Sequence, residues 1–150
     1  MKIRTDFVTN SSSSSFILGF KNEEEIEEIA NQLPYYWADH IKEEIISDIK
    51  NGITSKEAAV MLYQDTMYDW SWRFNGKDYF ALSRRERESS EYKDFIRNKK
   101  NAFSKELMDK LDNVEIISIV DYGDHDPLGS ELEHQIMPYL DNTIQRISNH

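Results

Sequence analysis

The hydrophobic residues of this chain follow two spacings, and the spacing changes several times along the sequence. Steps of three and four residues predict amphipathic helices, whereas alternation and short apolar runs predict strands. The resulting order is two strands, three helices, a hairpin, a long helix, a strand, a short helix and a closing strand. Because this order contains no regular βαβ repeat, it predicts an α+β fold with a mostly antiparallel sheet packed against several amphipathic helices. The 150 residues suit a single domain, 1–150.

Several helical segments combine a hydrophobic face with a start or stop signal. Asn22 precedes three glutamates, as an N-cap does before a negatively charged first turn. Residues 54–57 (Thr-Ser-Lys-Glu) match a capping box, and residues 83–86 (Ser-Arg-Arg-Glu) offer a second cap. Pro34 and Asn51-Gly52 mark helix ends. The predicted helices cover residues 22–33, 37–49, 54–67 and 92–111, with a short one starting at Ser130.

Strands are predicted at both ends of the chain and near residue 117. Residues 3–8 and 16–18 flank a serine run, which indicates two short strands joined by a serine loop. Residues 114–120 are a continuous apolar-rich run, and residues 143–148 alternate like a closing strand.

The strongest turn signal lies within residues 68–82. Aromatic residues at 70, 72 and 74 alternate with polar ones, and Asn75-Gly76 is typical of a type I′ turn. We therefore interpret this segment as a hairpin. The alternative is that the preceding helix continues through residue 73, because Tyr63, Met67 and Trp70 also fit one helical face.

The hydrophobic faces of these elements predict a core. If Phe103 belongs to it, its replacement by alanine costs roughly 3–5 kcal/mol through lost burial and a cavity. The residues predicted to be largely buried are Trp37, Ile41, Ile45, Phe95, Phe103, Leu107, Ile117 and Ile119.

The formal net charge is −10, and it is distributed unevenly. Residues 21–50 carry nine acids against three bases and residues 114–150 seven against one, whereas residues 84–110 carry nine bases against six acids. An acidic chain repels phosphate backbones, so we expect no direct nucleic-acid binding, and a basic protein partner fits the charge better. The basic segment is interpreted as a solvated helix face with its own ion pairs; the alternative is a contact within the chain or with a partner.

Composition also restricts where the protein works. Hydrophobic residues make up 39% and charged residues 31% of the chain, a balance typical of a folded domain in water. No apolar stretch is long enough to span a bilayer, and the first residues lead into no signal-peptide core, so we expect a cytoplasmic protein without membrane contact. The absence of cysteine excludes disulfides and thiol nucleophiles.

Two polar clusters are candidates for chemistry. The first is the serine run, where hydroxyl groups and consecutive backbone N–H groups can surround an anion such as phosphate. The alternative interpretation is a polar loop near the chain end. The candidate anion-binding residues are Asn10, Ser11, Ser12, Ser13, Ser14 and Ser15.

The second cluster follows the strand predicted at 114–120. Carboxylates and imidazoles at a strand end are ligands of divalent cations, and the closing strand can deliver His150 to the same place. The spacing matches neither an EF-hand nor a His-Glu-x-x-His motif. Alternatively, these acids only form a turn and a helix cap. Apart from this metal no cofactor is predicted, and the candidate ligands are Asp121, Asp124, His125, Asp126, His134 and His150.

Residues 7–17 read Phe-Val-Thr-Asn-Ser-Ser-Ser-Ser-Ser-Phe-Ile. This block resembles an N-terminal block shared by many uncharacterised bacterial and phage-borne proteins, and it covers only the first twenty residues or so. A weaker similarity to some of those proteins extends to residues 122–124, 132–134 and 147–150. No activity is known for them, so the resemblance implies no catalytic role. It implies that the serine loop and the C-terminal polar cluster belong to one surface of a protein carried by a mobile element.

Two classes of function are compatible with these features. The preferred hypothesis is an acidic, non-enzymatic binding protein that engages a basic, nucleic-acid-handling partner by presenting carboxylates where phosphates would lie. The alternative is a small hydrolase or transferase that uses a serine of residues 11–15 together with the C-terminal Asp/His cluster, with or without a metal. The sequence assigns no catalytic residue and no oligomeric state.

Overall fold

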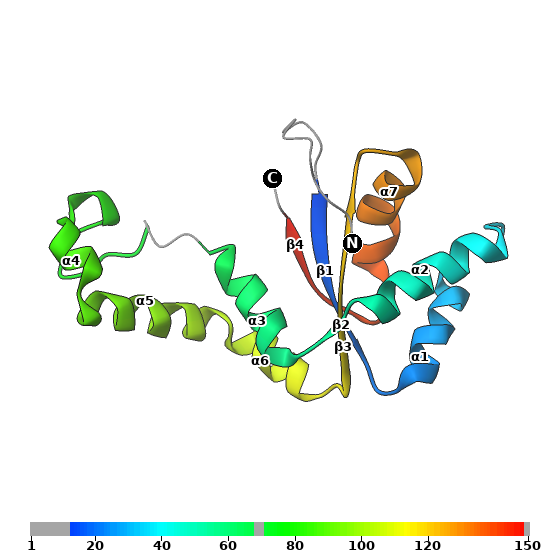
Figure 1. Ribbon diagram of the computed structural model, residues 1–150, viewed down its shortest axis with the longest axis horizontal. Helices are drawn as coiled ribbons and strands as arrows, with labels where there is room; N and C mark the ends of the chain where they lie inside the picture. Colours follow the sequence, from blue (N-terminus) through cyan, green and yellow to red (C-terminus); the bar gives the residue numbers. More distant parts are fainter. Residues whose placement is uncertain (1–12, 68–70, 149–150) are drawn as a thin grey trace.

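The computed structural model describes residues 13–67 and 71–148 and centres on one antiparallel sheet (Figure 1). The strand order is β2-β3-β1-β4, and each neighbouring pair runs antiparallel. The prediction of an α+β fold with a mostly antiparallel sheet is confirmed. The strands are β1 (Ser13–Phe20), β2 (Ile53–Thr54), β3 (Ile116–Gly123) and β4 (Thr143–Ser148).

Helices account for most of the remaining described residues. Short 3-10 helices lie at Glu28–Gln32, Tyr79–Ala81 and Met137–Tyr139, and a π-helix covers Leu132–Ile136. Within the described ranges no helix is long and apolar enough to cross a membrane. The α-helices are α1 (Glu23–Glu27), α2 (Asp39–Asn51), α3 (Lys56–Asp65), α4 (Arg84–Glu88), α5 (Ser90–Phe103), α6 (Lys105–Asp112) and α7 (Pro127–Glu131).

Strand β1 is buried along its whole length because helices cover both faces of the sheet. Phe16, Leu18 and Phe20 point to one face, where they pack with residues of α1, α2 and the π-helix. Ile17 points to the other face, where it packs with residues of α3 and α6. Since successive side chains of a strand point to opposite faces, this one strand contributes to both hydrophobic cores.

Residues 71–103 form an arm that extends away from the sheet (Figure 1). Its aromatic side chains pack on one another: the rings of Trp72 and Phe103 are stacked with centroids 5.6 Å apart. Phe74 packs against both Tyr92 and Phe95, at centroid distances of 5.4 and 5.2 Å, and those two rings also contact each other. Such aromatic pairs stabilise a fold beyond the area they bury, so the arm has its own small hydrophobic cluster.

The arm explains why part of the predicted core is wrong. Phe103 is 59% exposed, because α5 carries it away from the sheet to the arm, where its ring stacks on that of Trp72. Ile45, Leu107 and Ile117 are buried as predicted. The remaining predicted core residues, Trp37, Ile41, Phe95 and Ile119, are half-buried.

The segment 68–82 corresponds to neither predicted alternative. Asn75 and Gly76 have positive φ angles of 52° and 79°, as a type I′ turn requires, and Phe74 and Lys77 form an antiparallel bridge around them. The returning chain becomes a 3-10 helix at Tyr79–Ala81, so the longer hairpin is wrong. The helical alternative is also wrong, because α3 ends at Asp65 and residues 71–73 are not helical. Trp70 lies outside the described residues.

Other boundaries differ from the predictions for local reasons. Ser13–Ser15 belong to β1 and not to a loop, while the strand predicted at 3–8 lies outside the described residues. The long helix is interrupted at Ser104, whose hydroxyl donates a hydrogen bond to the carbonyl of Lys100 (2.7 Å). The last short helix begins at Pro127 instead of Ser130, because Asp126 caps it.

Candidate binding site

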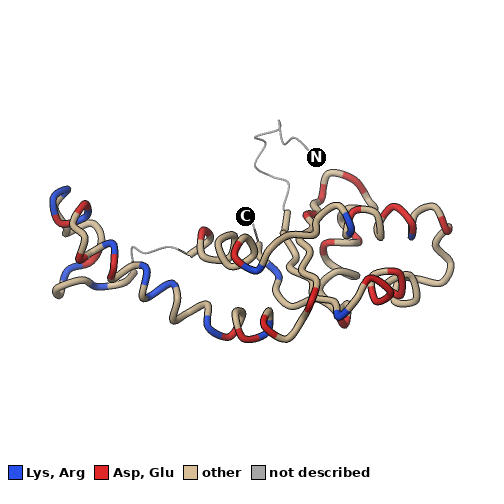
Figure 2. The backbone as a smooth tube through the Cα atoms, turned by 60° about the horizontal axis from the view of Figure 1, so that its bottom comes forward, with Lys and Arg blue, Asp and Glu red and all other residues tan. Residues whose placement is uncertain are grey.

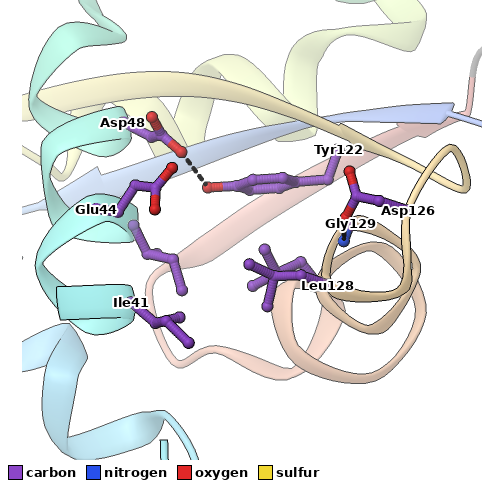
Figure 3. A pocket seen from close by; sticks show the side chains of 9 residues that line it. Ile41, Glu44, Asp48, Tyr122, Asp126, Leu128 and Gly129 are labelled. Carbon is purple, nitrogen blue, oxygen red and sulfur yellow. Dashed lines mark hydrogen bonds between the residues drawn. The ribbon is translucent and has the colours of Figure 1, made fainter. Parts of the chain in front are cut away.

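A pocket of about 130 Å³ lies between α2 and α7, beside the end of β3 (Figure 3). Helix α2 brings side chains three and four residues apart to its inner side, so Ile41, Glu44 and Asp48 follow one another at the pocket. Tyr122 comes from β3, and the turn after β3 leads into α7 on the opposite side. The complete lining is Ile41, Glu44, Ile45, Asp48, Tyr122, Asp126, Leu128, Gly129 and Leu132.

The hydroxyl of Tyr122 joins β3 to α2 across this pocket. It donates a hydrogen bond to Oδ2 of Asp48 over 3.1 Å (Figure 3). Burial raises the pKa of the Tyr122 phenol well above its usual value, and the nearby carboxylates of Asp48 and Glu44 raise it further. Tyr122 therefore keeps its proton and acts as a hydrogen-bond donor to Asp48.

This raised pKa gives an expected pH dependence. An unfolded tyrosine ionises near pH 10, whereas Tyr122 in the folded protein stays protonated there. The stability that depends on the neutral phenol is present in full below about pH 10 and is lost as the pH rises further, by up to about 1.4 kcal/mol per pH unit. We expect urea unfolding above pH 10 to show a steeper loss of stability in wild type than in Tyr122→Phe. Parallel curves would contradict the proposed role of the phenol.

Two of the carboxylates at the pocket differ in how they are engaged. Oδ1 of Asp126 accepts a hydrogen bond from the backbone N–H of Gly129 (2.7 Å), which caps α7. Its Oδ2 lies 3.1 Å from Nε2 of His125. Glu44, by contrast, makes no hydrogen bond or ion pair with any residue that the structure describes. Glu44 is thus the carboxylate most available to a ligand.

The pocket belongs to a strongly negative end of the molecule. Figure 2 shows that Lys and Arg gather along the arm, whereas Asp and Glu dominate α1, α2 and the turn before α7. Residues 21–50, which carry nine acids and three bases, are called the acidic segment below. Residues 71–110 instead carry eleven bases against seven acids. The charge separation along the sequence is therefore also a separation in space.

The structure places the metal-ligand candidates in different surroundings. His134 Nε2 lies 3.0 Å from Oδ1 of Asp124 and 3.3 Å from Oε1 of Glu133, and the three groups offer ligand atoms within 4.8 Å of one another. Asp121 instead accepts a hydrogen bond from the hydroxyl of Ser15. His150 lies outside the described residues. Metal binding stays a prediction.

Glu133 belongs to this group with Asp124 and His134, but it is absent from the predicted set of metal ligands. Its side chain is fully buried. Nothing in the local sequence distinguishes it from Glu131, because the π-helix at Leu132–Ile136 decides which side chain turns inward.

The described serines lie beside the C-terminal segment without forming a loop. Ser13, Ser14 and Ser15 pair with residues 121–123 of β3. The hydroxyl of Ser14 accepts a hydrogen bond from Nε of Arg146 (3.1 Å). All three serines are buried. The candidate residues Asn10, Ser11 and Ser12 lie outside the described residues, and anion binding stays a prediction.

The sequence interpretation missed the pocket itself. Ile41 and Ile45 were assigned to the core, and Asp126 to the metal cluster, but nothing connected them with Glu44, Asp48 or Tyr122. One signal was available, since Glu44 and Asp48 are four residues apart on a predicted helix and must share a side of it. Tyr122, which donates a hydrogen bond to Asp48, lies 74 residues further along the chain, so no local sequence pattern connects the two residues.

Fold and site together define an α+β protein with a pocket that is acidic at its mouth. No protein-family model, no curated protein and no solved structure matches the chain.

Proposed function

We propose that this protein is a non-enzymatic binding protein whose acidic segment engages a basic partner of the kind that handles nucleic acids. The observation that carries this proposal is the uncompensated charge of residues 21–50. Among the described residues, Glu27 is the one carboxylate of this segment that forms an ion pair, with Lys50. The other carboxylates of the segment form no ion pair with any residue that the structure describes, although Glu23 lies near enough to Lys50 to help raise the pKa of that lysine.

The exposure of these carboxylates to water also supports the proposed binding function. Eight of the nine acidic residues in the segment are exposed, and Glu25 is half-buried. Its Oε1 accepts a hydrogen bond from the backbone N–H of Lys21 (2.9 Å), so it serves the local helix start. Among the described residues, Asp48 and Glu27 are the exposed acids of this segment whose side chains form a hydrogen bond.

The arm shows the opposite arrangement. Lys77 pairs with Glu86 (3.3 Å), Arg84 with Glu88 (3.0 Å) and Arg97 with Asp94 (3.0 Å). These exposed pairs contribute little stability individually, but they place a cation beside three of the five carboxylates of the arm. The predicted interpretation of this segment as a solvated helix face fits these pairs.

Such a distribution has a physical consequence for association. Like charges gathered on one end of a domain repel one another and destabilise the compact state, and a basic surface brought against them removes that repulsion. The field of the segment also steers a positively charged partner before contact. A protein that binds phosphate backbones already carries the required basic groove, which supports the choice of partner class.

The alternative enzymatic function has less support. It requires a reactive serine of residues 11–15 beside the C-terminal Asp/His cluster, and the hydroxyl of Ser15 does donate a hydrogen bond to Asp121 of that cluster. Ser13, Ser14 and Ser15 are, however, buried within β1, where they are poorly placed to reach a substrate, and the hydroxyl of Ser14 contacts Arg146. We therefore prefer the binding function.

The proposal is tested with an arginine-rich peptide as the probe. Replacing Glu23, Glu24 and Glu28 together with glutamine removes three exposed charges from the acidic segment. We expect the association rate, measured by stopped flow at about 0.01 M salt, to fall about fivefold. In wild type the rate should also fall on going to about 0.1 M salt, because the Debye length shrinks from about 30 Å to about 10 Å.

A matched control separates local charge from net charge. Glu88, Glu91 and Glu106 are exposed glutamates outside the acidic segment, on α4, α5 and α6, and their replacement by glutamine changes the net charge equally. We expect this control to bind the peptide as fast as wild type. Equal losses in both triple variants would show that only net charge matters, and the proposal would then be wrong.

A further inference from the structure

The pocket between α2 and α7 combines an apolar surface with a negatively charged one. Its floor is aliphatic: Ile45 and Leu132 are each only 2% exposed, and Ile41 and Leu128 are half-buried beside them. Its mouth carries the exposed carboxylates of Glu44, Asp48 and Asp126 (Figure 3). The residues that line it include no lysine, arginine or histidine. The pocket is therefore apolar inside and negative outside.

The carboxylates are arranged to accept further hydrogen bonds. Tyr122 donates to Oδ2 of Asp48, which fixes that side chain toward the pocket. Glu44 lies one helical turn before Asp48 and faces the same space (Figure 3). Asp126 contributes its charge, although Oδ1 is occupied by the cap of α7. Two carboxylates of one helix face thus converge above an aliphatic floor.

These features exclude several ligand classes. An anion is repelled by the carboxylates, and a pure hydrocarbon would desolvate them without giving a hydrogen bond in return. A bare divalent cation prefers a shell of six or more oxygens, which a floor of isoleucine and leucine does not supply. An organic cation on an apolar stem satisfies both halves, because its stem contacts the floor while its charged end meets Glu44 and Asp48.

We propose that this pocket binds an arginine side chain of the basic partner, an inference that rests on the proposed function. A guanidinium group is planar, weakly hydrated and rich in N–H donors, so it suits two carboxylates better than an ammonium group does. The volume of about 130 Å³ is of the order of a cavity that holds benzene, enough for a guanidinium group and part of its stem. The partner is the source because Glu44 and Asp48 belong to the acidic segment.

The test uses N-acetyl-arginine methylamide as the probe and the uncharged citrulline analogue, which has nearly the same shape, as its control. We expect the arginine probe to shift the backbone amide NMR signals of Leu128 and Gly129, and the citrulline probe to leave them in place. Glu44→Gln should weaken binding of the arginine probe about fivefold, as expected for a solvent-exposed ion pair.

A neighbouring residue provides the matched variant. Glu43 is exposed on α2 and makes the same change in net charge when replaced by glutamine, but it does not line the pocket. Glu43→Gln should therefore bind the arginine probe as wild type does. Equal weakening by Glu43→Gln and Glu44→Gln, shifts from the citrulline probe, or the absence of shifts at Gly129 would each overturn the inference.

The arginine-rich peptide distinguishes the source of the cation and the two proposals. We expect the peptide to shift the same pocket signals at a lower concentration than the free arginine probe, because the acidic segment steers it. A free probe that binds as tightly as the peptide would overturn the assignment to a protein partner. If peptide binding depends on Glu23, Glu24 and Glu28 but not on Glu44, the pocket inference fails and the proposed function stands. If the arginine probe binds while the peptide association ignores the acidic segment, the proposed function fails.

Discussion

Replacing Phe16 with alanine lowers the free energy of unfolding by about 3–5 kcal/mol, the largest effect that we expect from a single substitution in this protein. Phe16 is fully buried in β1 and belongs to the core under α1 and α2. Its removal loses the transfer free energy of the ring and leaves a cavity that the surrounding strands cannot close. Urea unfolding of wild type and variant measures the difference.

Phe103 is the matched control for Phe16. It was predicted to be a core residue, yet it is 59% exposed, and its ring stacks on that of Trp72. Its replacement by alanine should cost about 1 kcal/mol, the scale of one aromatic pair. If both alanine variants lose the same stability, the arm packs on the body of the protein more closely than the structure shows.

Gly52→Ala should also destabilise the protein strongly, by about 3 kcal/mol. A Cβ atom at this position would lie 2.1 Å from the carbonyl oxygen of Ile119 and 2.9 Å from Oγ of Ser118. The first of these is a backbone atom of β3, so it cannot rotate away. The carbonyl of Gly52 also accepts a hydrogen bond from the N–H of Ile119 (3.0 Å), which holds the two segments together.

Gly76→Ala is the control for Gly52→Ala, because the two glycines are required for different reasons. Gly76 has a φ angle of 79° but no atom within 4 Å of the place where its Cβ would be. Only backbone strain opposes alanine there, at a cost of about 1–2 kcal/mol. Urea unfolding of both variants provides the comparison. A larger loss at Gly76 than at Gly52 would show that Gly52 lies further from β3 than described.

Local signals predicted the helix starts well, because a cap is made by residues three positions apart. Oδ1 of Asn22 accepts a hydrogen bond from the N–H of Glu25 (3.0 Å). The cap of α3 lies one residue later than the predicted capping box: Ser55, and not Thr54, accepts a hydrogen bond from the N–H of Ala58 (3.1 Å). The capping box formed by Ser83 and Glu86 is present with both of its hydrogen bonds. The turn at Asn75-Gly76 is likewise confirmed, since positive φ angles depend on these two residues alone.

Gly52 shows how a correct boundary can arise from a different cause. The pair Asn51-Gly52 predicted the end of a helix, and α2 does end at Asn51. Yet Gly52 has a φ of −91°, which any residue adopts. The glycine is needed because the backbone of β3 approaches it, and a contact between residues 52 and 119 has no local pattern.

The serine run was misread for a related reason. Serine favours turns and caps because its hydroxyl competes for nearby backbone groups, so five serines indicated a loop. In the sheet, Ser14 and Ser15 direct their hydroxyls to Arg146 and Asp121, which lie more than 100 residues away in the chain. Ser13–Ser15 therefore adopt a strand conformation because of cross-strand hydrogen bonds that exist only in the folded protein.

The sequence by itself determined the α+β class, the caps of α1 and α4, the turn at residues 75–76 and the acidity of residues 21–50, because periodicity, caps and charge depend on residues close together in the chain. Only the tertiary structure decided that Phe103 leaves the core, that Ser13–Ser15 enter the sheet, and that Tyr122 reaches Asp48 to form one side of the pocket. A helix pattern shows which residues share a face, but what that face meets depends on the packing of distant segments.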